Sequence, residues 1–242
     1  MLFHRPKLRN LRASRGPRPA TTARSLMDIE AARQQMIDQQ VRTWDVLDAR
    51  VLDTLRRVRR ELFVPEALRG AAFADAPIPL ACGQSMLAAK FHGKILQALA
   101  VEPGETALEV GTGCGYLAAC LSELGAQTTA LEAHPQLAAL ARANLRAAGF
   151  PGVQVVEADA TRWEPTERYD VIVITASLPS YDSRYQQWLK IGGRLFLIVG
   201  QSEPMMALVV SRKSETEFTR AEQFETAVAP LENVIRPSRF VF

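Results

Sequence analysis

The sequence predicts an α/β protein whose core is a Rossmann-like, doubly wound, mostly parallel sheet with an N-terminal helical cap. A strand-length apolar run at 106–110 leads into a glycine loop, which opens into a helical pattern. Two later strand-like runs, 127–132 and 153–159, each end in an acidic residue. Helical patterns separate these runs, and such alternation is typical of parallel sheets. The continuous apolar run at 170–175 indicates a strand that is covered on both faces.

The composition indicates a soluble globular protein. A chain of 242 residues forms one large α/β domain or two small ones. Hydrophobic residues make up 48% and charged residues 23% of the sequence, which is an ordinary balance. No apolar run reaches the ~18–20 residues that a membrane helix needs. The three cysteines have neither metal-ligand spacing nor a secreted disulfide pattern, so we expect no metal site and a cytoplasmic location.

The formal net charge of +3 comes from the N-terminus. Residues 1–24 carry seven basic side chains and no acidic one. The remainder has 22 basic and 26 acidic side chains, a net charge of −4. This mildly acidic part gives no electrostatic reason to expect nucleic-acid binding.

Residues 1–26 are predicted to be a disordered basic extension, because they mix arginine with proline, serine, threonine and glycine and lack an apolar period. Three interpretations are open: an extension from an upstream start codon with Met27 as the usual start, a basic arm for an anionic partner, or an organelle transit peptide. Residues 27–242 then form one domain. Its expected parts are a helical cap and loop at 27–88, an α/β core at 89–200 and C-terminal strands at 201–242.

Sequence periodicity predicts the remaining elements. Helices are expected at 28–44, 49–58, 90–100, 117–124, 136–148 and 179–189. Further strands are expected at 195–199, 207–210 and 240–242. Asp45 or Asp48 is a suitable N-cap for the second helix, and His134 for the helix that begins at Pro135. Two proline-containing apolar segments between residues 61 and 80 suit neither a regular helix nor a central strand, so we expect them to cover the binding site.

The glycine loop carries the first functional signal. Gly111 can adopt a positive φ at little cost, and Gly113 and Gly115 allow close approach of a ligand or a neighbouring strand. We expect the free N–H groups of the loop, together with the helix N-terminus, to face the ligand.

Two nucleotide ligands are considered for this loop. A dinucleotide fold requires G-x-G-x-x-G with a small residue in the last position, where this chain has Tyr116. Glu109, two residues before the loop, would repel a pyrophosphate but suits a ligand with an amino group and a sulfonium. A purely structural glycine turn in another α/β protein is the alternative.

The segment from Glu109 to Gly115 resembles the first motif of class I S-adenosylmethionine-dependent methyltransferases. This resemblance implies S-adenosyl-L-methionine as cofactor, with Glu132 at the ribose hydroxyls and Asp159 at the adenine. Solvated charges at strand ends are the alternative for these two acids. The residues that the resemblance assigns to the cofactor are Glu109, Gly111, Thr112, Gly113, Gly115, Glu132 and Asp159.

A more specific resemblance covers almost all of residues 28–242. The order and spacing seen in protein-L-isoaspartate O-methyltransferases are matched by Met36–Arg42, Leu62–Pro65, Asp75–Pro79, Gly83–Ser85, Leu108–Tyr116, Tyr169–Thr175, Leu189–Leu195 and Val228–Leu231. The resemblance implies an enzyme that methylates a carboxylate of L-isoaspartyl residues in damaged proteins. The methyl ester then leads through a succinimide back to aspartate, which is a protein repair.

The chain departs from this family in one loop. The usual family sequence is Gly-Gln-Thr-Ile-Ser-Gln-Pro, in which the second hydroxyl residue is thought to orient the acceptor carboxylate. Here Ser85 keeps the first hydroxyl, and the resemblance assigns it as the catalytic hydrogen-bond donor to the carboxylate. Leu87 stands in place of the serine and cannot form a side-chain hydrogen bond.

This departure keeps two other hypotheses open. Met86 and Leu87 would make the acceptor pocket more apolar, which favours a small carboxylic acid or a different protein carboxylate as acceptor. The chain would alternatively be a cofactor-binding protein without transferase activity.

The expected chemistry is an in-line displacement and requires no general base. A carboxylate acceptor is already ionised near neutral pH. Alignment of the two reactants is worth ~7–11 kcal/mol. We therefore expect neither His92 nor His134 to act as a catalytic base.

Overall fold

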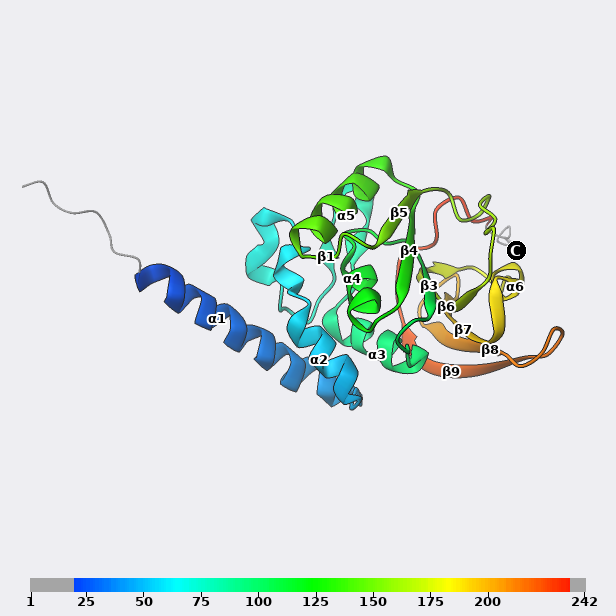
Figure 1. Ribbon diagram of the computed structural model, residues 1–242, viewed down its shortest axis with the longest axis horizontal. Helices are drawn as coiled ribbons and strands as arrows, with labels where there is room; N and C mark the ends of the chain where they lie inside the picture. The colour runs from blue at the N-terminus through cyan, green and yellow to red at the C-terminus, as the bar shows by residue number, and fades with distance from the viewer. Residues whose placement is uncertain (1–19, 236–242) are drawn as a thin grey trace, which may run out of the picture.

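A seven-stranded sheet in the order β5-β4-β3-β6-β7-β8-β9 forms the centre of the computed structural model, which describes residues 20–235, with side chains from residue 28 (Figure 1). Its strands are β3 (Thr106–Val110), β4 (Gln127–Glu132), β5 (Gln154–Glu157), β6 (Tyr169–Leu178), β7 (Leu189–Val199), β8 (Met205–Arg212) and β9 (Phe218–Thr226). The strands from β5 to β7 in this order are parallel, and β8 is antiparallel to both of its neighbours. The predicted mostly parallel sheet is confirmed.

Helices and short turns complete the fold. The α-helices are α1 (Ala20–Met36), α2 (Ala49–Arg57), α3 (Ala89–Leu99), α4 (Tyr116–Glu123), α5 (Pro135–Ala147) and α6 (Arg184–Gln187). The cap also contains the π-turn η1 (Ile37–Val41), the 3-10 turns η2 (Arg42–Trp44), η3 (Arg60–Leu62), η4 (Glu66–Ala71) and η5 (Ala81–Gly83), and the two-stranded ladder β1 (Ile78–Pro79) with β2 (Ser85–Met86). None of the helices in the described part is both long and apolar enough to cross a membrane.

Alternate residues of the central strands pack on opposite sides of the sheet, as the period of two in a strand requires. One side packs against the cap and α3, α4 and α5; its strand residues are Ala107, Ala130, Val171, Val173, Phe196 and Ile198. The other side packs against α6 and nearby loops; its strand residues are Leu108, Val110, Leu131, Ile172, Ile174, Leu195 and Leu197. Both faces are covered, which explains the continuous apolar strand at 170–175.

The start of α1 corrects the predicted extension. The helix begins at Ala20, so residues 20–26 are helical rather than disordered, and residues 1–19 lie outside the described part. No proline or glycine occurs among the 17 residues of α1, which begins directly after Pro19, and this composition permits a helix. Figure 1 shows the N-terminal part of α1 projecting away from the sheet. At the next helix, Asp48 is the N-cap, and its carboxylate accepts the Arg50 N–H at 2.8 Å.

The predictions fail most in the C-terminal half. The helix expected at 179–189 is reduced to α6, because β6 continues to Leu178 and an Asx-turn at Asp182 then precedes Arg184. Strand β7 begins at Leu189 rather than at residue 195, and the Gly192–Gly193 pair lies at an irregularity within the strand. The edge strand β9 was not predicted. The strand expected at 240–242 lies outside the described residues.

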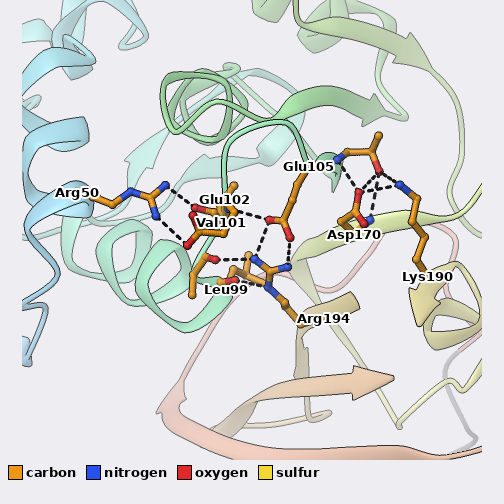
Figure 2. Close-up of polar contacts among 10 residues, drawn as sticks. Arg50, Leu99, Val101, Glu102, Glu105, Asp170, Lys190 and Arg194 are labelled. Atoms are coloured by element: carbon orange, nitrogen blue, oxygen red, sulfur yellow. Dashed lines mark hydrogen bonds and ion pairs between the residues drawn. The ribbon is translucent and has the colours of Figure 1, made fainter. Parts of the chain in front are cut away.

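Long side chains join the strands at the end of the sheet where the central strands β3 and β6 begin (Figure 2). Arg194 donates to the carbonyl oxygens of Leu99 and Ala100 at the end of α3 and to both carboxylate oxygens of Glu105. The Arg194 and Glu105 side chains are 17% and 21% exposed. Beside them Lys190 donates to Asp170 at 2.7 Å. These bonds fix the register of the strands at the end opposite the site described below.

We predict that Arg194→Met lowers the free energy of unfolding by about 2 kcal/mol, because Glu105 and two carbonyls lose a charged partner in a mostly buried place. Urea denaturation measures this change. Lys190→Met is the matched control: Lys190 is 43% exposed, so its loss should cost less than about 1 kcal/mol. Equal losses of unfolding free energy in the two variants would contradict the larger stabilising role of Arg194.

Candidate active site

A cavity of about 470 Å³ opens at the carboxyl ends of the parallel strands. The chain passes from β3 outward to β5 and then returns to place β6 on the other side of β3. Ligands of open α/β sheets bind at such a reversal of strand order. Among the residues that line the cavity are Ser85, Gly111, Gly113, Glu132, Asp159 and Thr175. The fold thus brings together five of the eight predicted site residues.

The glycine loop is fastened to the end of β4. The N–H groups of Gly111 and Thr112 both donate to the Leu131 carbonyl, at 2.9 and 3.1 Å. The Gly113 N–H donates to Glu132 at 2.8 Å, and the Gly115 N–H donates to the Thr112 carbonyl. The expectation that free loop N–H groups face the ligand is therefore wrong for these four groups. Such a loop does not provide a phosphate cradle, which argues against a dinucleotide.

Two loop glycines are required for different reasons. Gly111 has φ +84°, and a Cβ there would lie 2.9 Å from the Thr175 hydroxyl, which donates to the Gly111 carbonyl at 2.8 Å. Gly115 has φ +88°, and a Cβ there would lie 3.1 Å from Leu145 on α5. Gly115 therefore allows α5 to pack closely against the loop. Gly115, Thr112 and Glu109 do not line the large cavity.

Glu132 ends β4 and is 5% exposed. One carboxylate oxygen accepts the Gly113 N–H at 2.8 Å, and the other accepts the His134 N–H at 3.0 Å. A carboxylate offers about four acceptor positions, so each oxygen can accept one further hydrogen bond. The side chain is thus oriented by the backbone and still able to bind a diol.

Asp159 lies beyond the end of β5, on the same cavity. Its Oδ1 accepts the backbone N–H and the hydroxyl of Thr161 at 2.8 and 2.7 Å, and its Oδ2 accepts the Asn233 amide at 3.0 Å. The pKa of Asp159 is lowered: partial burial acts to raise it, but the Thr161 and Asn233 hydrogen bonds outweigh that effect. Asp159 is therefore a charged acceptor at neutral pH.

Glu109 lies beneath the loop. The residue is 1% exposed, and its carboxylate accepts the Thr112 hydroxyl at 2.6 Å. Glu109 borders a separate hollow of about 30 Å³. Burial raises the pKa of Glu109 to about 7, against the opposing effect of the Thr112 hydrogen bond. Its predicted contact with the amino group of a cofactor stays a prediction.

The cavity is electrostatically one-sided. Its described lining includes four carboxylates but no lysine or arginine; they belong to Glu132, Asp159, Glu203 and Glu232. This charge repels phosphate and favours a ligand with a cationic centre. Both the loop and the electrostatics thus support the sulfonium cofactor over a dinucleotide.

The cap supplies the opposite wall. Ser85 and Leu87 line the cavity, whereas Met86 is 3% exposed and belongs to the hydrophobic core. The expected apolar contribution of Met86 to this cavity is therefore wrong, because successive residues of the short strand β2 point to opposite faces. Gln84 donates to Glu232 at 2.8 Å and so joins the cap to the C-terminal segment.

Sequence reasoning missed three parts of the site. Thr175 ends the fourth predicted strand, and its place beside the strand reversal was the available signal. The segment 227–232 lines the cavity, and Asn233 holds Asp159, but these contacts join distant parts of the chain and leave no local pattern.

His134 is the N-cap of α5 without a side-chain cap bond, and His92 is buried at 4% exposure.

The strand order, the fastened glycine loop and the acids at the ends of β4 and β5 define a class I methyltransferase. A solved structure supports this fold: a Plasmodium falciparum protein described as a protein-L-isoaspartate O-methyltransferase, in complex with S-adenosyl-L-homocysteine. The TM-score is 0.73 at 16% sequence identity, covering 84% of this chain and 97% of that one.

Sequence comparisons identify the family. The family model for protein-L-isoaspartate(D-aspartate) O-methyltransferase matches residues 31–234. Protein-L-isoaspartate O-methyltransferase 1 of Rhodopseudomonas palustris is 35% identical over 212 residues, which are 87% of this chain and 86% of the relative. The Methanoculleus marisnigri enzyme is 37% identical over 187 residues, 76% of this chain and 85% of its own length. The chain belongs to the protein-L-isoaspartate O-methyltransferase family of S-adenosylmethionine-dependent enzymes.

We predict that Glu132→Gln weakens the binding of S-adenosylhomocysteine at least about tenfold. Both Glu132 oxygens accept backbone N–H groups, so an amide would set its own donor against one of them and would also lose the charge. Isothermal titration calorimetry measures the Kd. Glu157→Gln is the matched control, because this exposed residue lies opposite Glu132 on the neighbouring strand β5. Equal affinities in the two variants would refute the ribose role.

We predict a pH signature for Glu109. Its pKa is about 7 in the folded protein and near 4.5 when unfolded, so its contribution to stability is complete below about pH 4.5 and is lost as the pH rises through 7. Relative to Glu109→Gln, the wild-type free energy of unfolding should fall by up to about 3 kcal/mol between pH 4 and pH 8. Denaturant titrations at several pH values measure both proteins. A constant difference would contradict the raised pKa.

Proposed function

We propose that this protein transfers the methyl group of S-adenosylmethionine to the carboxylate of L-isoaspartyl residues in damaged proteins. The family model across residues 31–234 is the observation that carries this proposal. The cavity supports it, because one wall carries the cofactor acids and the other carries the cap loop with Ser85. We also propose a cytoplasmic location, which the three free cysteines support.

The described residues fit the cofactor. Glu132 has two acceptor positions free of the backbone, as a ribose diol requires. Asp159 is ionised and has an acceptor oxygen for an adenine amino group. Leu131, Ala158 and Ala160 line the same cavity and suit a flat apolar ring. The surplus of carboxylates suits the sulfonium charge.

The chain has to position an acceptor rather than activate it. The cofactor, when bound, supplies an electrophilic methyl group on sulfur. The acceptor carboxylate is ionised near neutral pH, so no protein group needs to remove a proton. In this proposal Ser85, which lines the cavity, donates a hydrogen bond to that carboxylate. Alignment of the two reactants within one cavity can lower the barrier by ~7–11 kcal/mol.

A different carboxylate acceptor is the second candidate, and Leu87 favours it. Leu87 lines the cavity at the position of the family's second hydroxyl residue. Phe91 and Val228 also contribute apolar surface there. Such a wall favours an acceptor with apolar substituents, such as a small carboxylic acid.

Methyl transfer from labelled S-adenosylmethionine to an isoaspartyl peptide tests the proposal, with the matching aspartyl peptide as control. We expect base-labile label on the isoaspartyl peptide and none on the control. Absence of label on both peptides, with cofactor binding confirmed by calorimetry, would overturn the proposal. Small carboxylic acids are then the acceptors to test.

We predict that Leu87→Ser raises kcat/KM for the isoaspartyl peptide by roughly two- to tenfold, because it restores a hydroxyl that can bond the carboxylate, worth ~0.5–1.5 kcal/mol. Initial-rate kinetics measure it. Leu87→Ala is the control that opens the same space without the hydroxyl. If serine and alanine have the same effect, the hydroxyl is not limiting.

A further inference from the structure

A buried arginine lies behind the acceptor loop, which we define as residues 83–88. Arg60 is 0% exposed, on the turn η3 of the cap. Its Nη2 donates to the Leu87 carbonyl at 2.7 Å, and its Nε donates to the Ala72 carbonyl at 2.8 Å. One rigid side chain therefore connects the loop with a second segment of the cap.

The third contact of Arg60 is with His92 on α3, where its Nη1 lies 3.3 Å from Nδ1 of the imidazole. Arginine has donors and no acceptor, so this contact is a hydrogen bond in the tautomer whose Nδ1 is unprotonated. Burial and, second, the charge of Arg60 lower the pKa of His92 well below its usual value, which keeps the imidazole neutral. The His92 ring packs edge-on against Tyr116 at 5.0 Å, and Arg60 lies 5.2 Å from the same ring.

The surroundings of Arg60 explain why it is held firmly. Among the described residues no carboxylate forms an ion pair with it. Its charge is balanced by two carbonyl dipoles, a neutral imidazole and the face of Tyr116. A buried cation is stable only when such partners are in place, so the guanidinium and the Leu87 carbonyl constrain each other.

We propose that Arg60 is the positioning residue of the acceptor loop: it ties the Leu87 carbonyl to Ala72 and His92, and so sets the place of Ser85 and Leu87 in the cavity. The identity of the acceptor rests on the proposed function. Arg60 itself is separated from the cavity by the loop and is absent from its lining.

This arrangement also accounts for the tolerance of leucine at position 87. Arg60 binds the main-chain carbonyl, which every residue type possesses. The two-residue ladder of Ile78 with Met86 and Pro79 with Ser85 holds the other end of the loop. The course of the loop therefore does not require a hydroxyl at position 87, although the Leu87 side chain also packs against the core of the cap.

Arg60→Met tests the proposal, and Arg59→Met is the matched control. Arg59 is the adjacent arginine, is half exposed and pairs with Glu61 at 3.2 Å. The measurements are kcat/KM for the isoaspartyl peptide, the Kd of S-adenosylhomocysteine, and hydrogen exchange of the amides in 83–88. For Arg60→Met we expect kcat/KM to fall about tenfold or more and loop exchange to rise by a similar factor, as loss of a charged hydrogen bond implies. The Kd should change less than about twofold.

A purely structural role predicts a different pattern. Equal losses of kcat/KM and cofactor affinity, or loop exchange equal to that of Arg59→Met, would overturn the proposal. His92→Asn keeps an acceptor near the place of Nδ1, so it should retain more kcat/KM than His92→Leu; the reverse order would also overturn it.

In two situations the kcat/KM values of the variants cannot be compared. If Arg60→Met does not fold, the wild-type protein decides: protection of 83–88 comparable to α3 supports the proposal, and fast exchange of that segment overturns it. If the wild-type protein does not methylate the isoaspartyl peptide, the proposed function fails. Loop exchange and cofactor affinity in the variants then still decide the role of Arg60.

Discussion

The site depends on the hydrogen bonds that join the glycine loop to the end of β4. The Leu131 carbonyl and the Glu132 carboxylate accept three consecutive loop N–H groups, from Gly111, Thr112 and Gly113. These bonds hold the loop as a fixed wall and orient Glu132 without using its full acceptor capacity. They also consume the donors that would bind phosphate. Local backbone pairing, together with the carboxylates around the cavity, thus selects a cationic cofactor over an anionic one.

The two walls of the cavity are built by different means. The cofactor wall is formed at the carboxyl ends of the parallel strands. At the opposite ends of the strands, Arg194 and Glu105 hold the sheet together. The wall that we propose for the acceptor is a short loop of the cap, with little regular structure of its own. Its rigidity must come from side chains behind it, and the Arg60 guanidinium supplies the contact that is visible. The departure of this chain from the usual family loop, Leu87, thus falls on the cap side of the cavity, while Glu132 and Asp159 lie on the sheet side.

Local signals account for the parts of the fold that were correctly predicted. Strand β4 has the predicted bounds, and β3 follows from the apolar run before Gly111. Glu132 and Asp159 border the cavity as expected, because carboxyl ends of parallel strands meet at one edge. In the C-terminal half the wrong predictions concern α6, the start of β7 and the unpredicted β9, where pairing with a neighbouring strand overrides local propensity.

The sequence by itself determined the fold class, the glycine loop, the two acids at the strand ends and the family, because each of these is written in residues close together along the chain. Only the tertiary structure decided that the loop N–H groups are occupied, that Met86 turns into the core, and that Glu109 lies outside the cavity lining. It alone brought Asn233 to Asp159 and Arg60 to the Leu87 carbonyl. Such contacts join residues far apart in the chain, and their geometry depends on how complete elements pack, so no local pattern encodes them.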